Sequence, residues 1–160
     1  FHRGELESVL ISAERAIALS PHNATFLAAM GNHIGWAGNM ERGVAMVQKA
    51  IAINPNHPPW YHYILTDYFI RKGDHVTALG HALRLTWGLS WDYMYRTVIY
   101  ARSGRMDEAR TEADELREVY PDFGKEMRGE FEKYYFPDEV IGAYFETLRE
   151  VGIDIPEPTN

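Results

Sequence analysis

The sequence predicts an all-α fold, a stack of antiparallel helical hairpins that forms one α-solenoid domain over residues 1–160. Two near-identical hexapeptides, at 16–21 and 50–55, lie 34 residues apart, a period typical of helical repeats. Glycines stand in the turns between paired helix-like stretches, at Gly38, Gly73 and Gly104. Prolines, which cannot continue a helix, close the units at Pro21, Pro55 and Pro121.

The chain begins with half a unit at 5–22, for which the sequence predicts a single amphipathic helix. The first full unit follows at 24–57. Asn23 can cap its first helix, and Gly38 can supply the left-handed backbone that ends that helix. Pro55 stops the second helix. That helix should turn its apolar residues inward, namely Val44, Val47, Ile51 and Ile53.

The next two units span 59–89 and 90–122, and their second helices carry small residues where helices must cross closely. These small residues are Ala78, Ala82, Ala109 and Ala113. Residues 123–152 depart from this pattern and predict two closing helices, which Pro137 separates. The two helices and the tail that follows them are expected at 123–135, 138–151 and 153–160.

The spacing, the small residues and the prolines of 5–122 resemble the tetratricopeptide repeat. The resemblance implies helical hairpins stacked into a right-handed superhelix, whose role is to bind other proteins and not to catalyse a reaction. The sequence departs from the repeat at Leu85 and Leu116, where the repeat has a small residue late in its second helix.

A narrower resemblance lies in three stretches, at 56–61, 120–123 and 148–152. They are similar to the C-terminal tetratricopeptide regions of some bacterial signalling proteins, either class III adenylate cyclase-like proteins or winged-helix regulators. The resemblance implies that this chain is a regulatory C-terminal part of a multidomain bacterial protein. The first residue, Phe1, is not a methionine, and a fragment of a longer chain is therefore expected.

Charge and composition argue against several classes of function. The formal net charge is −7, and residues 105–160 hold 16 acidic and 7 basic side chains, so this end of the chain repels nucleic-acid phosphates. No apolar run reaches the roughly 20 residues that span a bilayer. Neither nucleic acid nor a membrane is therefore an expected partner. Because the sequence has no cysteine and no recognisable secretion signal, we expect a cytoplasmic protein.

Partner binding is expected in the concave groove that the first helix of each unit lines. Helical phase turns nine side chains toward this predicted groove: Asn32, Trp36, Trp60, Tyr63, Asp67, Arg71, Trp91, Tyr95 and Arg102. Tryptophan, tyrosine and arginine often dominate binding energy, which favours a protein or peptide partner. Aromatic residues at helical spacing can equally form core, and the acidic closing helices could cover the groove and make it autoinhibited. Four further aromatic residues are expected in the core: Tyr61, Tyr68, Trp87 and Tyr100.

The leading half-unit predicts a second interface, because its helix lacks the first helix of a hairpin. The residues of its apolar stripe are Leu6, Val9, Leu10, Ala13 and Ile17. A stripe of this kind should not stay open to water, so either an upstream segment or a second copy of the chain should cover it. We therefore expect a homo-oligomer that forms through this end.

The sequence contains no recognisable catalytic or cofactor-binding constellation. It has no HExxH motif, no glycine-rich phosphate loop and no nucleophile elbow, so we expect no enzyme activity, no cofactor and no metal site. His22, His57 and His75 fall in predicted turns, where solvated side chains are expected. A structural oligomerisation element and a ligand- or peptide-sensing domain remain alternatives to a protein-interaction scaffold.

Overall fold

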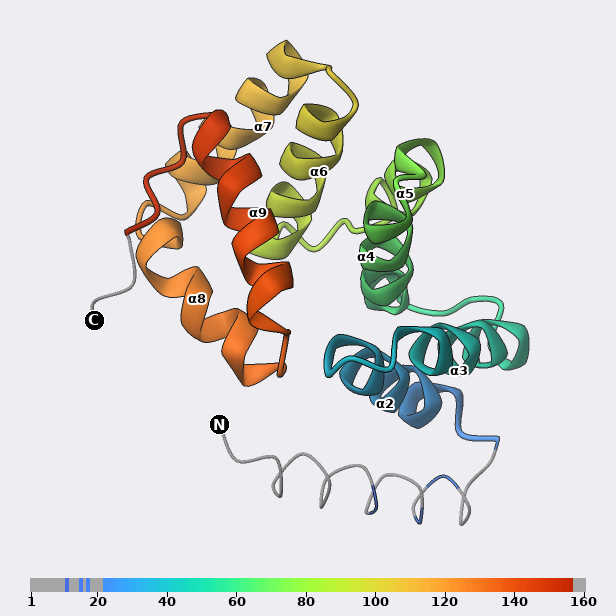
Figure 1. Ribbon diagram of the computed structural model, residues 1–160. Helices are drawn as coiled ribbons and strands as arrows, with labels where there is room; N and C mark the ends of the chain where they lie inside the picture. The colour runs from blue at the N-terminus through green and yellow to red at the C-terminus, as the bar shows by residue number, and fades with distance from the viewer. Residues whose placement is uncertain (1–10, 12–14, 16, 18–21, 157–160) are drawn as a thin grey trace.

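The computed structural model describes residues 11, 15, 17 and 22–156, which fold as helices paired into hairpins (Figure 1). The helices, in chain order, are α2 (Ala24–Trp36), α3 (Met40–Ile53), the 3-10 turn η1 (Pro59–Tyr61), α4 (His62–Lys72), α5 (His75–Ala82), α6 (Ser90–Arg102), α7 (Met106–Val119), α8 (Phe123–Lys133) and α9 (Asp138–Glu150). No strand occurs among the described residues, and the predicted all-α class is confirmed. In the same part of the chain, no helix has the length and apolar character needed to cross a membrane.

The turns α2–α3, α4–α5 and α6–α7 each contain a glycine with left-handed backbone. Gly38, Gly73 and Gly104 have φ angles of 107°, 73° and 73°, a region that glycine enters without the clash of a Cβ atom. The first described helix is capped at the predicted residue, because the side chain of Asn23 accepts a hydrogen bond from the backbone N–H of Phe26 at 3.0 Å. Local sequence therefore determines where helices end and where the chain reverses.

Glycines within the helices of the first hairpin let α2 and α3 pack closely. A Cβ atom on Gly43 would lie 2.7 Å from the Cα of Gly35, and a Cβ atom on Gly31 would lie 2.8 Å from the Cγ2 of Val47. Real Cβ atoms essentially never approach other heavy atoms within 3.0 Å. The close helix crossing therefore requires these glycines, although glycine has a low intrinsic helix propensity.

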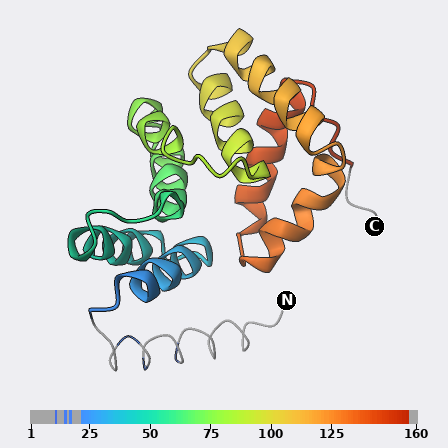
Figure 2. The ribbon, with the colours of Figure 1, turned by 180° about the vertical axis from the view of Figure 1, so that it is seen from behind.

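The closing helices lie next to the α6–α7 hairpin, and the turn between them approaches α2, as both views show (Figure 1, Figure 2). Helix α9 packs along α6, and the end of α8 reaches α2. There Tyr134 stacks on His33, with ring centroids 5.5 Å apart. Just beyond α8, Phe136 stacks on Trp36 at 5.6 Å. The closing segment therefore contacts both the first and the third described hairpin.

Two side chains that the sequence predicts inside the fold are exposed. Ile53 is 39% exposed, because it is the last residue of α3 and lies at the edge of the stack. Trp87 is 54% exposed, because α5 ends at Ala82 and Trp87 lies in the connector to α6, where helical phase no longer sets its direction. Among the other aromatic residues predicted to be core, the first is fully buried and the other two are half-buried: Tyr61, Tyr68 and Tyr100.

The predicted self-association stripe lies almost entirely outside the described residues. This applies to Leu6, Val9, Leu10 and Ala13. The fifth residue, Ile17, is half-buried and packs against the hydrophobic core. The homo-oligomer therefore stays a prediction.

Candidate functional site

Several residues predicted to line the groove form one aromatic cluster on α2, α4 and α6. The ring of Trp36 on α2 lies 6.5 Å from that of Tyr63 on α4 and 6.1 Å from that of Trp91 on α6, measured between centroids. Tyr63 in turn lies 6.2 Å from Tyr95. These separations are typical of favourable aromatic pairs. The first helices of three hairpins thus build a shared surface.

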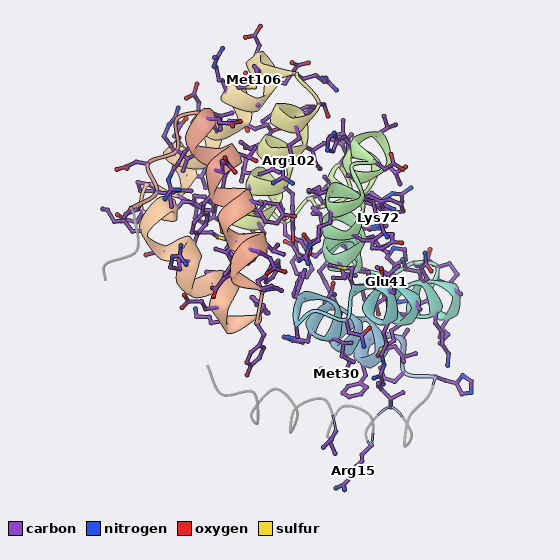
Figure 3. The ribbon with its side chains drawn as sticks, viewed as in Figure 1. Arg15, Met30, Glu41, Lys72, Arg102 and Met106 are labelled. Atoms are coloured by element: carbon purple, nitrogen blue, oxygen red, sulfur yellow. The ribbon has the colours of Figure 1, made fainter. Side chains whose placement is uncertain are left out.

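Helix α9 covers the part of this surface that carries the predicted charged residues. Asp67 is fully buried and accepts two hydrogen bonds from Arg71, at 3.1 Å from Nε and 2.6 Å from Nη2. Asp67 also accepts a hydrogen bond from the hydroxyl of Tyr144 on α9. Arg102, which is labelled in Figure 3, donates to Oγ1 of Thr147 on α9 at 3.1 Å. The protein's own closing helix therefore occupies the charged half of the predicted groove.

The ion pair between Asp67 and Arg71 has a structural role. Burial raises the pKa of Asp67, whereas the guanidinium of Arg71 and the hydrogen bond from Tyr144 oppose that rise. The guanidinium carbon of Arg71 also lies 5.5 Å from the ring centroid of Phe136, a cation–π distance. Arg71 therefore links α4 to the turn between the closing helices.

Two further predicted groove residues, Asn32 and Tyr95, serve the fold. Asn32 is 4% exposed, and its Oδ1 accepts a hydrogen bond from the backbone N–H of Ile64 at 3.0 Å. Its Nδ2 donates to the backbone oxygen of Ala28 on its own helix at 3.1 Å, so both polar groups are bonded and the Oδ1 ties α2 to α4. Tyr95 is fully buried and out of reach of a partner.

An open pocket of about 250 Å³ remains beside the closing helices. Aromatic side chains dominate its wall, and we call it the aromatic pocket: His33, Trp36, Trp60, Tyr63, Trp87, Trp91 and Tyr134. These residues include all four tryptophans of the sequence. They come from α2, η1, α4, α6, the α5–α6 connector visible in Figure 2, and the end of α8. An apolar, concave pocket of this kind is the default position for a binding site.

The aromatic pocket contains only part of the predicted groove. The predicted residues that line it with aromatic rings are Trp36, Trp60, Tyr63 and Trp91. His33, Trp87 and Tyr134 are not among the predicted groove residues. Trp87 is predicted to be core, and Tyr134 belongs to a closing segment whose path the repeat pattern does not define. The aromatic run at 134–136, directly before Pro137, is a sequence signal that could have pointed to this position.

A buried carboxylate stands behind the wall of the aromatic pocket. Asp92 is fully buried and accepts a hydrogen bond from the hydroxyl of Tyr63 at 2.6 Å. Its other oxygen accepts hydrogen bonds from the backbone N–H groups of Gly88 at 2.9 Å and Leu89 at 3.3 Å. Burial, together with the Asp92 carboxylate, raises the pKa of Tyr63. Burial lowers the pKa of His33, so this ring is neutral near pH 7.

Three histidines form a hydrogen-bonded chain that runs from the connector after α3 into the second described hairpin. His57 Nε2 lies 3.0 Å from His62 Nε2, and His62 Nδ1 lies 2.8 Å from His81 Nδ1. His57 Nδ1 lies 3.2 Å from the backbone oxygen of Asn54, which can only accept a hydrogen bond. Neutral imidazoles therefore donate in one direction, from His81 to His62, from His62 to His57, and from His57 to Asn54.

The hydrogen-bonded row of histidines changes the expectation for His57, which the sequence predicts to be solvated. His57 is half-buried and engaged at both ring nitrogens. Burial is the largest cause that lowers the pKa of His62, to about 4, and the neighbouring His81 and His57 add to it. Within the described ranges, no group of three or more His, Asp or Glu side chains is arranged to hold a metal ion.

The comparisons with known proteins concern the fold. No family model matches the chain, and no curated protein matches its sequence. A crystal structure of MamA is similar, with a TM-score of 0.64 at 16% identity over 93% of this chain and 90% of that chain. A second MamA crystal structure has a TM-score of 0.63 at 16% identity, with 93% and 84% covered. The MamA RS-1 ArsTM double mutant has a TM-score of 0.64 at 16% identity, with 93% and 86% covered. This chain therefore has a tetratricopeptide-like helical repeat fold.

Proposed function

We propose that the protein is a non-catalytic interaction scaffold that binds a partner protein or peptide at the aromatic pocket. The observation that carries this proposal is an exposed apolar surface beside the pocket. Leu83, Trp87 and Leu89 are 57%, 54% and 40% exposed, and all three lie in the connector between α5 and α6. Trp87 and Leu89 also line the pocket. Exposed apolar groups gathered at a cavity are typical of interaction sites.

The dimensions of the pocket favour one anchoring side chain of the partner. Its volume of about 250 Å³ is below the roughly 300–1,000 Å³ of pockets that enclose drug-sized ligands. A partner segment could place one side chain in the pocket and lie over the connector. Tryptophan and tyrosine, which form the wall of the pocket, are among the residue types that most often dominate binding energy at protein interfaces.

An unsatisfied donor in the wall also supports a ligand. The indole Nε1 of Trp36 is buried and has no hydrogen-bond acceptor among the described residues. Leaving a buried donor unpaired costs about 1–3 kcal/mol. A partner that shifts the pocket side chains slightly and offers a backbone carbonyl would remove this cost.

The wider context that we propose is a regulatory C-terminal part of a cytoplasmic bacterial signalling protein. Its support is the similarity of residues 56–61, 120–123 and 148–152 to such regions. In that setting the closing helices, which already occupy the inner surface of α4 and α6, would limit partners to the aromatic pocket.

The experiment that tests the proposal starts with peptides selected from a random display library against the wild-type protein. Their affinity is then measured by calorimetry for the wild type, Trp87→Ala and Val76→Ala. Val76 is a matched control, because it is 86% exposed on α5 and does not line the pocket. Trp87→Ala should weaken binding by about 2 kcal/mol or more, roughly 30-fold, as expected for a hot spot. Peptides that bind Trp87→Ala as tightly as the wild type would refute the proposal.

Two other functions would give different results. A structural homo-oligomerisation element would yield no peptide that depends on Trp87, while the assembly through the leading helix would remain. A small-molecule sensor would yield a ligand that fills the pocket without contacts to the connector, so that Leu83→Ala would have no effect on its affinity.

A further inference from the structure

We infer that the aromatic pocket accepts a quaternary ammonium group, carried on a trimethylated lysine side chain of the partner. This inference rests on the proposed function, because it names the anchor that a partner places in the pocket. It goes further, because it predicts a preference for a positively charged group over a neutral group of the same shape.

The first argument is that the pocket rings have no internal cation. Six cation–π pairs occur among the described residues, and they use rings elsewhere in the fold: Tyr68, Tyr93, Tyr100, Phe136, Tyr144 and Phe145. None of these rings belongs to the aromatic pocket. The rings of Trp60 and Trp87, by contrast, border the open cavity and take part in none of these six pairs. Tryptophan faces give the strongest cation–π attraction.

The second argument is the sign of the charge around the pocket. The Asp92 carboxylate is fully buried and is held by Tyr63 and Leu89, both of which line the pocket. It forms no ion pair with an Arg, Lys or His side chain in the described part of the chain. His33, the titratable base in the wall, is neutral near pH 7 because burial lowers its pKa. The negative charge behind the wall therefore favours a cation in the cavity.

The third argument concerns hydrogen bonding and distinguishes among cations. Asn32 also borders the cavity, but both of its polar groups are already bonded to α2 and α4. The hydroxyl of Tyr63 donates to Asp92, so its oxygen can still accept, and the other side-chain acceptors of the wall are the imidazole of His33 and the hydroxyl of Tyr134. Because the rest of the wall is apolar, an unmodified lysine with three N–H donors or an arginine with five would exchange hydrogen bonds to water for few acceptors. A trimethylammonium group carries no N–H donor and retains its charge, so it fits the pocket best.

The acidity of the closing helices gives independent support for a basic partner. The segment that supplies Tyr134 to the wall belongs to residues 105–160, which hold 16 acidic and 7 basic side chains. A partner rich in lysine would be attracted to this end of the protein, and its association would be faster at low salt.

The test compares four probes: a short lysine-containing peptide, the same peptide with trimethyllysine, the same peptide with the neutral tert-butyl isostere of trimethyllysine, and free choline. Tryptophan fluorescence is a direct readout, because all four tryptophans line the pocket. Calorimetry provides the affinities. The trimethyllysine peptide should bind about tenfold or more tighter than the neutral isostere, as expected for a desolvated cation–π site. Equal or tighter binding of the neutral isostere would overturn the inference, as would no binding of either peptide.

Variants separate the cation preference from simple apolar contact. Trp87→Leu keeps an apolar side chain but removes the ring, so it should abolish the preference while the neutral isostere binds as before. Tyr100→Leu removes a half-buried ring that does not line the pocket and should leave the preference intact. A preference that survives Trp87→Leu would contradict the inference. Choline that binds as tightly as the trimethyllysine peptide would overturn the assignment to a partner side chain.

The failure of this inference can be told apart from failure of the proposed function. If selected peptides depend on Trp87 but the neutral isostere binds best, the scaffold function stands and the cation preference is wrong. If no peptide depends on Trp87 and the trimethyllysine probe does not bind, both are wrong.

Discussion

The carboxylate of Asp67 on α4 accepts a hydrogen bond from the hydroxyl of Tyr144 on α9, and both side chains are buried. The two residues lie 77 positions apart in the sequence. The bond joins the second described hairpin to the last helix across the inner face of the stack. Because Asp67 also binds Arg71, this one carboxylate connects a helix of the repeat to the closing segment.

Replacing Tyr144 with phenylalanine should destabilise the protein by about 1–3 kcal/mol, because Asp67 loses a donor where water does not reach. The free energy of unfolding is measured from urea titrations monitored by circular dichroism. Tyr100→Phe is the control, since the Tyr100 hydroxyl has no hydrogen-bond partner among the described residues and its ring is only half-buried. Equal stability of Tyr144→Phe and the wild type would show that the bond does not hold α9 in place.

Adding a methyl group to Gly43 should destabilise the first hairpin. Its Cβ would lie 2.7 Å from the Cα of Gly35, so α2 and α3 would have to separate, at a cost of about 1–3 kcal/mol for overpacking. Gly80 gives the opposite expectation, because it is an exposed residue of α5 and a Cβ atom there would meet no other atom within 4 Å. Gly80→Ala should therefore stabilise the protein by about 0.5–1 kcal/mol through helix propensity. Thermal melting of both variants measures the difference, and equal effects would refute the close crossing.

Acidification should destabilise the fold through the histidine chain. The pKa of His62 falls from 6.5 in an unfolded chain to about 4 in the folded protein. The unfolded state therefore binds more protons, and the contribution of His62 to stability is full above pH 6.5 and declines as the pH falls toward 4. Urea midpoints between pH 7.5 and 4 should decrease more steeply for the wild type than for His62→Leu. Parallel curves for the two proteins would contradict this assignment.

Self-association through the leading helix can be checked directly by the solution mass. Light scattering over a concentration series should give a dimer or larger species, because the apolar stripe at 5–22 needs a cover. Val9→Glu should shift the protein toward a monomer, whereas Val76→Glu, at an exposed site of α5, should not. A wild-type protein that is monomeric at every concentration would contradict self-association and would indicate that an upstream segment covers the stripe.

The helices and their ends could be predicted from the sequence because local chemistry determines them. Asn23 caps α2, and Gly38, Gly73 and Gly104 take the left-handed conformation that ends each first helix. Pro137 marks the break between the two closing helices at the predicted residue. Each of these signals acts over a few residues, so one sequence is enough to detect it.

The candidate site was only partly predictable because it depends on contacts between distant residues. Helical phase predicts Trp36 and Trp91 on one surface, and they stack there. Helical phase wrongly predicts Trp87 to be core, because α5 ends five residues before it. Repeat periodicity also gives no information about Tyr134, whose position follows from the path of the closing helices. Sequence spacing thus indicates which surface is aromatic, but the path of irregular segments decides which part stays open.

The contact between Tyr134 and His33 has a consequence for how the protein unfolds and how it can evolve. In an open repeat array each unit touches only its neighbours, so the ends can fray and units can be added or lost. Here the end of α8 contacts α2, so the last helices of the stack pack back against its first described hairpin. The terminal units are therefore coupled, and unfolding should be a single cooperative event instead of a progressive loss from one end. An inserted repeat would separate these two rings, so the number of units is fixed by the geometry of closure.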